Sequence, residues 1–92
     1  MIKSFRHKGL KKFFTTGSTV GIQANHAPRL RRQLARLNVC ASPREMDSPG
    51  WGLHPLKGAL VGHYSVWVSG NWRLIFKFED GDAILVDYQD YH

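Results

Sequence analysis

The residues most suited to chemistry stand at the end of the chain, in the order Asp90, Tyr91 and His92. An imidazole titrates near neutral pH, so His92 beside a carboxylate is able to exchange protons with a substrate. Chain ends usually fray, but this tail directly follows Ala83 to Val86, a strand-forming stretch that would hold it against a sheet. The tail is therefore a candidate catalytic site.

Complementary groups occur earlier in the chain. Arg73 offers a cation for an anionic phosphorus centre, and His54 and Lys57 add a second imidazole and a second cation. Imidazole, carboxylate and cationic groups together are what general acid–base cleavage of RNA requires. Taken singly, each residue also has an ordinary structural explanation, such as a hydrogen-bonded histidine or a surface cation. Their combination is what suggests chemistry on a phosphodiester.

Length and charge limit the possibilities. Ninety-two residues allow one compact domain, residues 1–92, with little spare core, and 42% hydrophobic residues with three tryptophans argue for a folded globule. Residues 1–45 carry ten Lys or Arg and one carboxylate, whereas residues 46–92 carry three and six. A basic half is typical of a protein that binds a polyanion such as nucleic acid, and a merely solvated basic surface is the equal alternative.

Cysteine and histidine usage argues against a metal site. The lone Cys40 excludes an internal disulfide and a cysteine-rich zinc site, and the five histidines lack ligand-like spacing. Residues 1–8 are basic but precede no apolar run, so they do not form a signal peptide, and no stretch is long enough to span a membrane. We therefore expect a cytoplasmic protein with no cofactor.

The first half of the chain predicts two helices behind a short opening strand, Ile2 to Phe5. Leu10 to Phe14 has the spacing of a short helix with one apolar face and basic flanks. The second helix begins near an N-cap at Asn25, carries Pro28 in its first turn and ends at Asn38. Its apolar stripe consists of Leu30, Leu34 and Leu37. Its other side carries a cationic ridge of Arg29, Arg32 and Arg36, with Arg31 nearby.

Four aromatic or β-branched stretches in the second half predict strands. They are Trp51 to Leu56, Tyr64 to Ser69, Trp72 to Glu79 and Asp82 to Tyr88. The last three are separated by the two-residue signals for tight hairpin turns, Gly70-Asn71 and Asp80-Gly81. The expected fold is a small α+β domain in which two N-terminal helices pack on one face of a mainly antiparallel sheet.

These turns also predict which side chains share a face of the sheet. Counting from them, Val68 lies opposite Arg73, and Arg73 lies opposite Tyr88. Because side chains alternate along a strand, Asp90 and His92 would continue on the face of Arg73 and Tyr88, and these groups would converge. The other face would form the core under the helices, with Trp67, Trp72, Leu74, Phe76, Phe78, Ala83 and Leu85.

The order of motifs along nearly the whole chain resembles the HigB toxins of the RelE/ParE superfamily. The motifs are Met1 to Phe5, His7 to Lys11, Leu53 to Gly58, Gly62 to Val68, Asn71-Trp72-Arg73, Gly81-Asp82-Ala83 and Asp87 to His92. The resemblance implies a RelE-like fold and a ribosome-dependent mRNA endonuclease of a bacterial type II toxin–antitoxin pair. Such a protein cleaves mRNA in the ribosomal A site and is restrained by a HigA-like antitoxin with a helix-turn-helix domain.

The resemblance also implies a set of active-site residues and a reaction that needs no cofactor. The set is His54, Lys57, Arg73, Asp90, Tyr91 and His92. In our assignment the ribose 2′-hydroxyl attacks the adjacent phosphate, His92 or Asp90 takes its proton, and His54 protonates the leaving oxygen. Lys57 and Arg73 would stabilise the phosphorane, and Tyr91 would stack on or orient a base; which group is base and which is acid stays open. The RNA- and ribosome-binding set is Lys8, Lys11, Lys12, Arg29, Arg31, Arg32, Arg36 and Asn71.

The chain departs from the family pattern at two places. Some relatives have an arginine where this chain has Val68, so we expect one cation to be missing from the active face. Relatives also tend to carry charged residues at positions 59–61, where this chain has Ala59, Leu60 and Val61. That loop is therefore expected to pack differently or to touch a partner rather than RNA.

Two other functions compete with a nuclease. A ParE-like inhibitor of DNA gyrase would share the fold without needing acid–base residues, which His54, Arg73 and His92 together argue against. A plain RNA-binding module would explain the basic half of the chain but not the tail.

Overall fold

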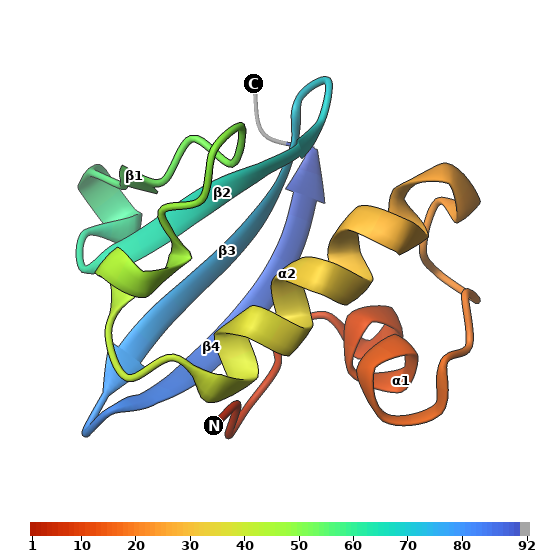
Figure 1. The fold of residues 1–92 in the computed structure, drawn as a ribbon, viewed down its shortest axis with the longest axis horizontal. Coiled ribbons are helices and arrows are strands. Elements are labelled where there is room, and N and C mark those ends of the chain that lie inside the picture. Colours follow the sequence, from red (N-terminus) through yellow and green to blue (C-terminus); the bar gives the residue numbers. More distant parts are fainter. Residues whose placement is uncertain (91–92) are drawn as a thin grey trace.

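The computed structural model describes residues 1–90, so Tyr91 and His92 lie outside the described part. Two α-helices precede a four-stranded antiparallel sheet in the order β1-β2-β3-β4, which confirms the predicted α+β meander (Figure 1). No helix within residues 1–90 is both long and apolar enough to cross a membrane. The elements are α1 (Lys8–Thr16), η1 (Ala24–His26), α2 (Ala27–Val39), η2 (Pro43–Met46), β1 (His54–Pro55), η3 (Gly58–Leu60), β2 (His63–Ser69), β3 (Trp72–Glu79) and β4 (Asp82–Asp90).

Helix α1 extends beyond its predicted bounds at both ends, whereas α2 begins after the predicted start and ends one residue after Asn38. His7 caps α1 by accepting the Leu10 N–H at its Nδ1, at 2.9 Å. Helix α2 begins at Ala27, after a short turn of 3₁₀-helix that contains Asn25, and its N-cap His26 makes no side-chain capping bond. The expected cap at Asn25 is therefore wrong. The predicted apolar stripe is fully buried, as Leu30, Leu34 and Leu37 each expose 1% or less.

The helices pack on one face of the sheet, as predicted (Figure 1). Helix residues such as Leu10 and Leu34 share one core with Val66, Leu74 and Phe76 of the strands. The first strand is much shorter than expected. Gly50 and Gly52 adopt positive φ angles of 82° and 57° and break the extended stretch, so only His54–Pro55 pair with β2.

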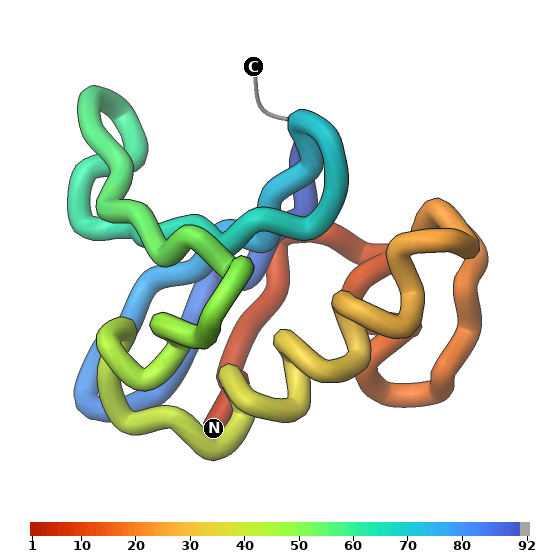
Figure 2. The backbone as a smooth tube through the Cα atoms, turned by 45° about the horizontal axis from the view of Figure 1, so that its top comes forward, coloured from red at the N-terminus to blue at the C-terminus, as the bar shows by residue number. Residues whose placement is uncertain are grey.

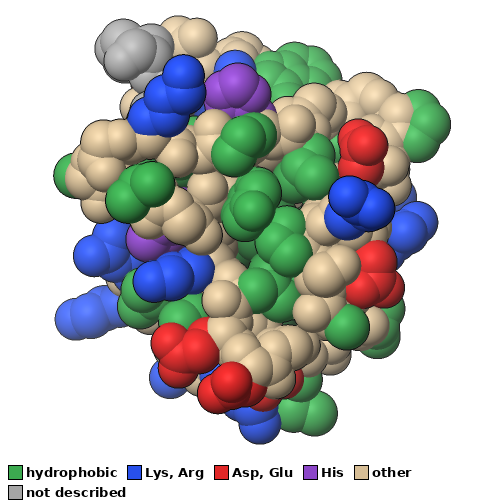
Figure 3. All heavy atoms as spheres, turned by 90° about the vertical axis from the view of Figure 1, so that its left-hand side faces the viewer, with side chains coloured by type: hydrophobic (Ala, Val, Ile, Leu, Met, Phe, Trp, Pro, Cys, Tyr) green, Lys and Arg blue, Asp and Glu red, His purple; other side chains and the backbone are tan. Residues whose placement is uncertain are grey.

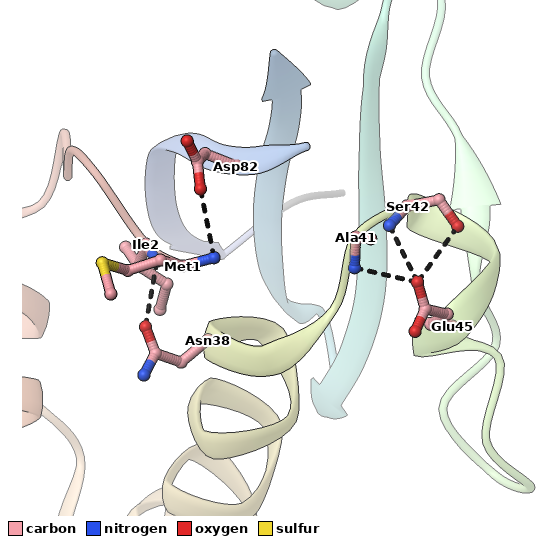
Figure 4. A network of polar contacts seen from close by, with 7 residues as sticks. All are labelled: Met1, Ile2, Asn38, Ala41, Ser42, Glu45 and Asp82. Atoms are coloured by element: carbon pink, nitrogen blue, oxygen red, sulfur yellow. Dashed lines mark hydrogen bonds and ion pairs between the residues drawn. The ribbon is translucent and has the colours of Figure 1, made fainter. Parts of the chain in front are cut away.

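The N-terminal segment lies along the outer edge of β4, where the sequence predicted a strand. It makes two isolated parallel bridges, Ile2 with Ala83 and Phe5 with Val86. The N-terminal amine also forms an ion pair with Asp82 at 3.3 Å, and the Ile2 N–H donates to Asn38 Oδ1 at 3.0 Å (Figure 4). The segment thereby ties β4 to the end of α2.

A bulge in β2 overturns half of the predicted register. Ser69 pairs with Trp72 across the two-residue turn, as expected, but Val68 is an extra residue and Arg73 pairs with Trp67. Val68 therefore does not lie opposite Arg73. Its side chain exposes 3% and belongs to the core, whereas Trp67, predicted to be in the core, exposes 37%.

A second bulge shifts the pairing of β3 with β4. Leu85 is the extra residue here, with a φ of 53°, and its N–H donates to Ser4 Oγ at 2.8 Å. Arg73 consequently pairs with Gln89, and Leu74 pairs with Tyr88. Tyr88 was predicted on the face of Arg73; instead it exposes 3% and lies in the core under the helices.

Tyr88 anchors the end of β4 to the two helical segments. Its Oη lies 2.6 Å from Nδ1 of the buried His26. Its ring stacks on Trp72 at a centroid distance of 4.5 Å and meets His7 edge-on at 5.4 Å. Burial raises the pKa of the Tyr88 hydroxyl, and a backbone hydrogen bond from Gln23 opposes that shift.

Val68→Arg tests the first bulge. Because the side chain at this position is buried in the core, an arginine there should lower the free energy of unfolding by about 3–5 kcal/mol, the cost typical of an unpaired buried charge. The matched control is Ser69→Arg, at a half-buried neighbour outside the core. Urea unfolding followed by tryptophan fluorescence measures both. Equal stability of the two variants would mean that the side chain at position 68 faces solvent.

Tyr88→Phe tests the anchor of β4. Near neutral pH it should lower the free energy of unfolding by about 1–3 kcal/mol, because His26 loses its buried partner. The folded-state pKa of Tyr88 is raised, so above about pH 10 the unfolded chain releases this proton first and wild-type stability falls. The gap between wild type and variant should therefore narrow as the pH rises. Tyr64→Phe, at a half-buried tyrosine, is the control; a gap that widens would contradict the assignment.

Candidate active site

A cavity of about 700 Å³ opens on the face of the sheet opposite the helices. Three strands and the loop before β1 contribute to it. The lining residues are Gly50, Gly52, His54, Leu56, Ser65, Trp67 and Arg73. Two of the residues expected to be catalytic, His54 and Arg73, are thus brought to one site.

The strand register explains why these side chains share a face. His54 pairs with Ser65, which pairs in turn with Ile75, and Trp67 pairs with Arg73. Directly paired residues in antiparallel strands point to the same side of the sheet. The short strand β1 is therefore sufficient to place an exposed imidazole beside the middle of the sheet.

Arg73 is held at the end of the cavity by the β2–β3 hairpin. Its Nη1 donates to the carbonyl oxygens of Gly70 at 3.2 Å and Trp72 at 3.3 Å. Within the described residues, these bonds use only one of the three guanidinium nitrogens. The others remain for an anion, and a planar guanidinium suits the two oxygens of a phosphate.

Strand β4 ends at Asp90, beside the β2–β3 hairpin that holds Arg73 (Figures 1 and 2). Gln89 pairs with Arg73, and Asp90 pairs with Trp72. Asp90 therefore lies on the opposite face from Arg73, one residue out of step with the predicted alternation. Tyr88 is buried and does not join the site. Tyr91 and His92 lie outside the described residues.

The remaining expected site residues lie at the edges of the site. Lys57 is exposed between β1 and η3 and does not line the cavity. Asn71 is exposed in the turn that holds Arg73. The segment with Ala59 and Leu60 forms η3, and Val61 after it is 71% exposed.

Sequence reasoning missed Trp67 and Ser65 as lining residues. The expected register placed Trp67 in the core and left Val66 and Val68 on the open face, although both valines are buried. A register that leaves two valines outside the core and buries a tryptophan is itself a signal that β2 contains an extra residue. The turn sequence alone does not reveal such a bulge.

The basic residues of the helices differ in their surroundings. Most are exposed, but Arg29 is half-buried with its Cζ 5.0 Å from the centre of the Trp67 ring, and Arg31 lies 5.5 Å from the Phe13 ring. Both arginines therefore pack on aromatic rings. The exposed members of the set are Lys8, Lys11, Lys12, Arg31, Arg32 and Arg36.

The side of the molecule that carries β1 has an uneven charge distribution. Figure 3 shows histidine and several Lys or Arg side chains toward the upper left of this face and most of its carboxylates toward the bottom and right. No group of three or more potential metal ligands is arranged for a metal ion within residues 1–90.

Comparison of the sequence with known proteins identifies the family of this chain. A family model described as "RelE-like toxin of type II toxin-antitoxin system HigB" matches residues 3–92. The chain is also 42% identical over its full 92 residues to the full length of a protein of Proteus vulgaris named "Endoribonuclease HigB". Toxins of type II systems are paired with an antitoxin, so this chain has an antitoxin partner. The chain belongs to the HigB-like family of RelE-like toxins.

Proposed function

We propose that this toxin is an endoribonuclease that cleaves mRNA in the A site of the ribosome. The observation that carries the proposal is the shared cavity of His54 and Arg73, at the end of the sheet where β4 finishes. The full-length similarity to a protein named as an endoribonuclease supports the same activity. The cavity is lined by an imidazole, which can transfer a proton, and by a cation, which can stabilise a developing negative charge.

The reaction begins with attack of the ribose 2′-hydroxyl on the adjacent phosphorus. Arg73, held by the hairpin carbonyls, stabilises the charge that develops on the phosphorane oxygens. His54 donates a proton to the leaving 5′-oxygen, and its exposed position on β1 gives it access to that atom. This chemistry uses side chains of the protein alone.

The general base of the reaction comes from the C-terminal tail, residues 90–92. His92 accepts the proton of the 2′-hydroxyl, because Asp90, the other candidate, lies on the face of the sheet opposite Arg73. Tyr91 orients a neighbouring nucleobase. Asp90 is the last described residue of β4 and pairs with Trp72, the neighbour of Arg73 in β3, which supports this proposal. Lys57, three residues after His54, adds positive charge from the rim of the site.

The basic helical surface binds the ribosome. Exposed lysines on α1 and arginines on α2 would contact rRNA phosphates. Asn71, in the turn next to Arg73, contacts the RNA. The antitoxin is HigA-like, with a helix-turn-helix domain, and the site of action is the cytoplasm, where translation takes place.

Loss of single proton-transfer groups tests the mechanism. His54→Ala and His92→Ala should each slow cleavage of ribosome-bound mRNA by about 10²- to 10⁴-fold, and Arg73→Gln by about 10²- to 10³-fold. Deletion of residues 90–92 should abolish cleavage. The measurement is mapping of cut sites and single-turnover rates on mRNA with and without ribosomes.

Lys77→Gln is the matched control, since Lys77 lies on the same strand as Arg73 but does not line the cavity. It should cleave like wild type. Cleavage at equal rates without ribosomes would exclude ribosome dependence. Growth arrest by a folded deletion variant that cuts no RNA would instead favour a gyrase inhibitor.

Salt dependence tests the ribosome-binding surface. Arg32→Glu with Arg36→Glu should weaken ribosome binding and reduce the slope of log affinity against log salt by about 2, because two phosphate contacts are lost. These two arginines are exposed, so the fold should persist. Arg44→Glu, at an exposed arginine outside both helices, is the control. Equal slopes for all proteins would mean that α2 is only a solvated surface.

A further inference from the structure

We propose that Trp67 is a stacking platform for a base of the mRNA next to the scissile phosphate. This inference rests on the proposed nuclease function and names one contact of its substrate. Trp67 is 37% exposed, although its backbone is paired with β3, and it lines the cavity together with His54 and Arg73.

The indole is fixed before any ligand arrives. Its Nε1–H donates to the Gly70 carbonyl oxygen at 2.9 Å, the acceptor that also holds Arg73. Its backbone N–H donates to Trp51 at 2.7 Å, and its carbonyl oxygen accepts from Gln33 Nε2 at 2.9 Å. A rigid ring loses little conformational entropy when a flat ligand stacks on it.

Arg29 supports the ring from the helical layer. Its Cζ lies 5.0 Å from the ring centre, and its Nη1 is buried with no hydrogen-bond partner among the described residues. Arg29 does not line the cavity whereas Trp67 does, so the indole contacts both α2 and the cavity. The cation also adds positive potential where a polyanion would lie.

The position of Trp67 determines which nucleotide of the mRNA can stack on it. Trp67 pairs directly with Arg73, and directly paired residues have Cβ atoms roughly 5 Å apart. A base stacked on the indole therefore belongs to a nucleotide that flanks the phosphate bound by Arg73. Stacking on an aromatic ring tolerates every base and favours those that stack most strongly, so a purine is preferred here.

The experiment isolates this contact from the rest of the ribosome interface. Toxin binding is measured on two ribosome complexes, one whose mRNA ends before the A site and one whose mRNA continues through it with 2′-O-methyl groups that prevent cleavage. The gain in affinity on filling the A site reports mRNA contacts alone. Trp67→Leu should reduce this gain by about 5- to 100-fold, the range typical of one base–aromatic contact.

Two variants complete the design. Trp67→Phe keeps an aromatic face and should retain most of the gain, whereas Arg32→Gln, an exposed arginine of α2, should weaken both complexes equally and leave the gain unchanged. Replacing the A-site nucleotides one at a time by abasic residues should abolish the effect of Trp67→Leu at one position only. Circular dichroism confirms the fold of each variant.

The outcomes separate this inference from the proposed function. If wild type cleaves mRNA but folded Trp67→Leu keeps the full gain, the platform is overturned and the nuclease stands. If the gain depends on Trp67 but neither the wild type nor any variant cleaves mRNA, the platform stands and the nuclease function fails. If filling the A site gives wild type no gain, the platform is overturned as well.

Discussion

The organisation of the site depends on two extra residues in the sheet, Val68 in β2 and Leu85 in β4. Each bulge reverses the facing of the residues beyond it, so Trp67 reaches the open face and Tyr88 reaches the core. The second bulge requires a positive φ at a leucine, a conformation that costs about 1–2 kcal/mol. The hydrogen bond from the Leu85 N–H to Ser4 Oγ and the parallel pairing of the N-terminal segment offset that cost.

The sequence predicted what local patterns determine. Helical periodicity located both helices, and Gly70-Asn71 and Asp80-Gly81 located both hairpins. Residue type alone identified His54 and Arg73, which do share a cavity. Bulges were not predictable, because they depend on how a strand meets the helices and its neighbour rather than on the turn. The predictions that Tyr88 is exposed, that Trp67 is buried and that Asp90 shares a face with Arg73 were wrong because the bulges were not foreseen.

The edge of β2 is where the basic helix and the cavity meet. Strand β1 pairs with β2 only as far as Ser65, so beyond that residue the edge has no neighbouring strand among the described residues. The backbone of Trp67 is satisfied instead by Trp51 on one side and the side chain of Gln33 on the other. Through Gln33 and Arg29, α2 contacts Trp67 at this edge, and Trp67 lines the cavity. A polyanion bound along α2 would reach the site without crossing an acidic region of that helix, which contains no carboxylate.

The pairing of residues 2–5 with residues 83–86 joins the earliest and latest parts of the described chain. Contacts that span so much of a chain form late, because their formation closes the longest loop. During synthesis, the N-terminal segment has no strand to pair with, and His26 Nδ1 lacks its Tyr88 partner, until β4 emerges. A growing chain therefore completes neither the pairing of its N-terminal segment nor the contact of His26 with Tyr88 until its last strand has been synthesised.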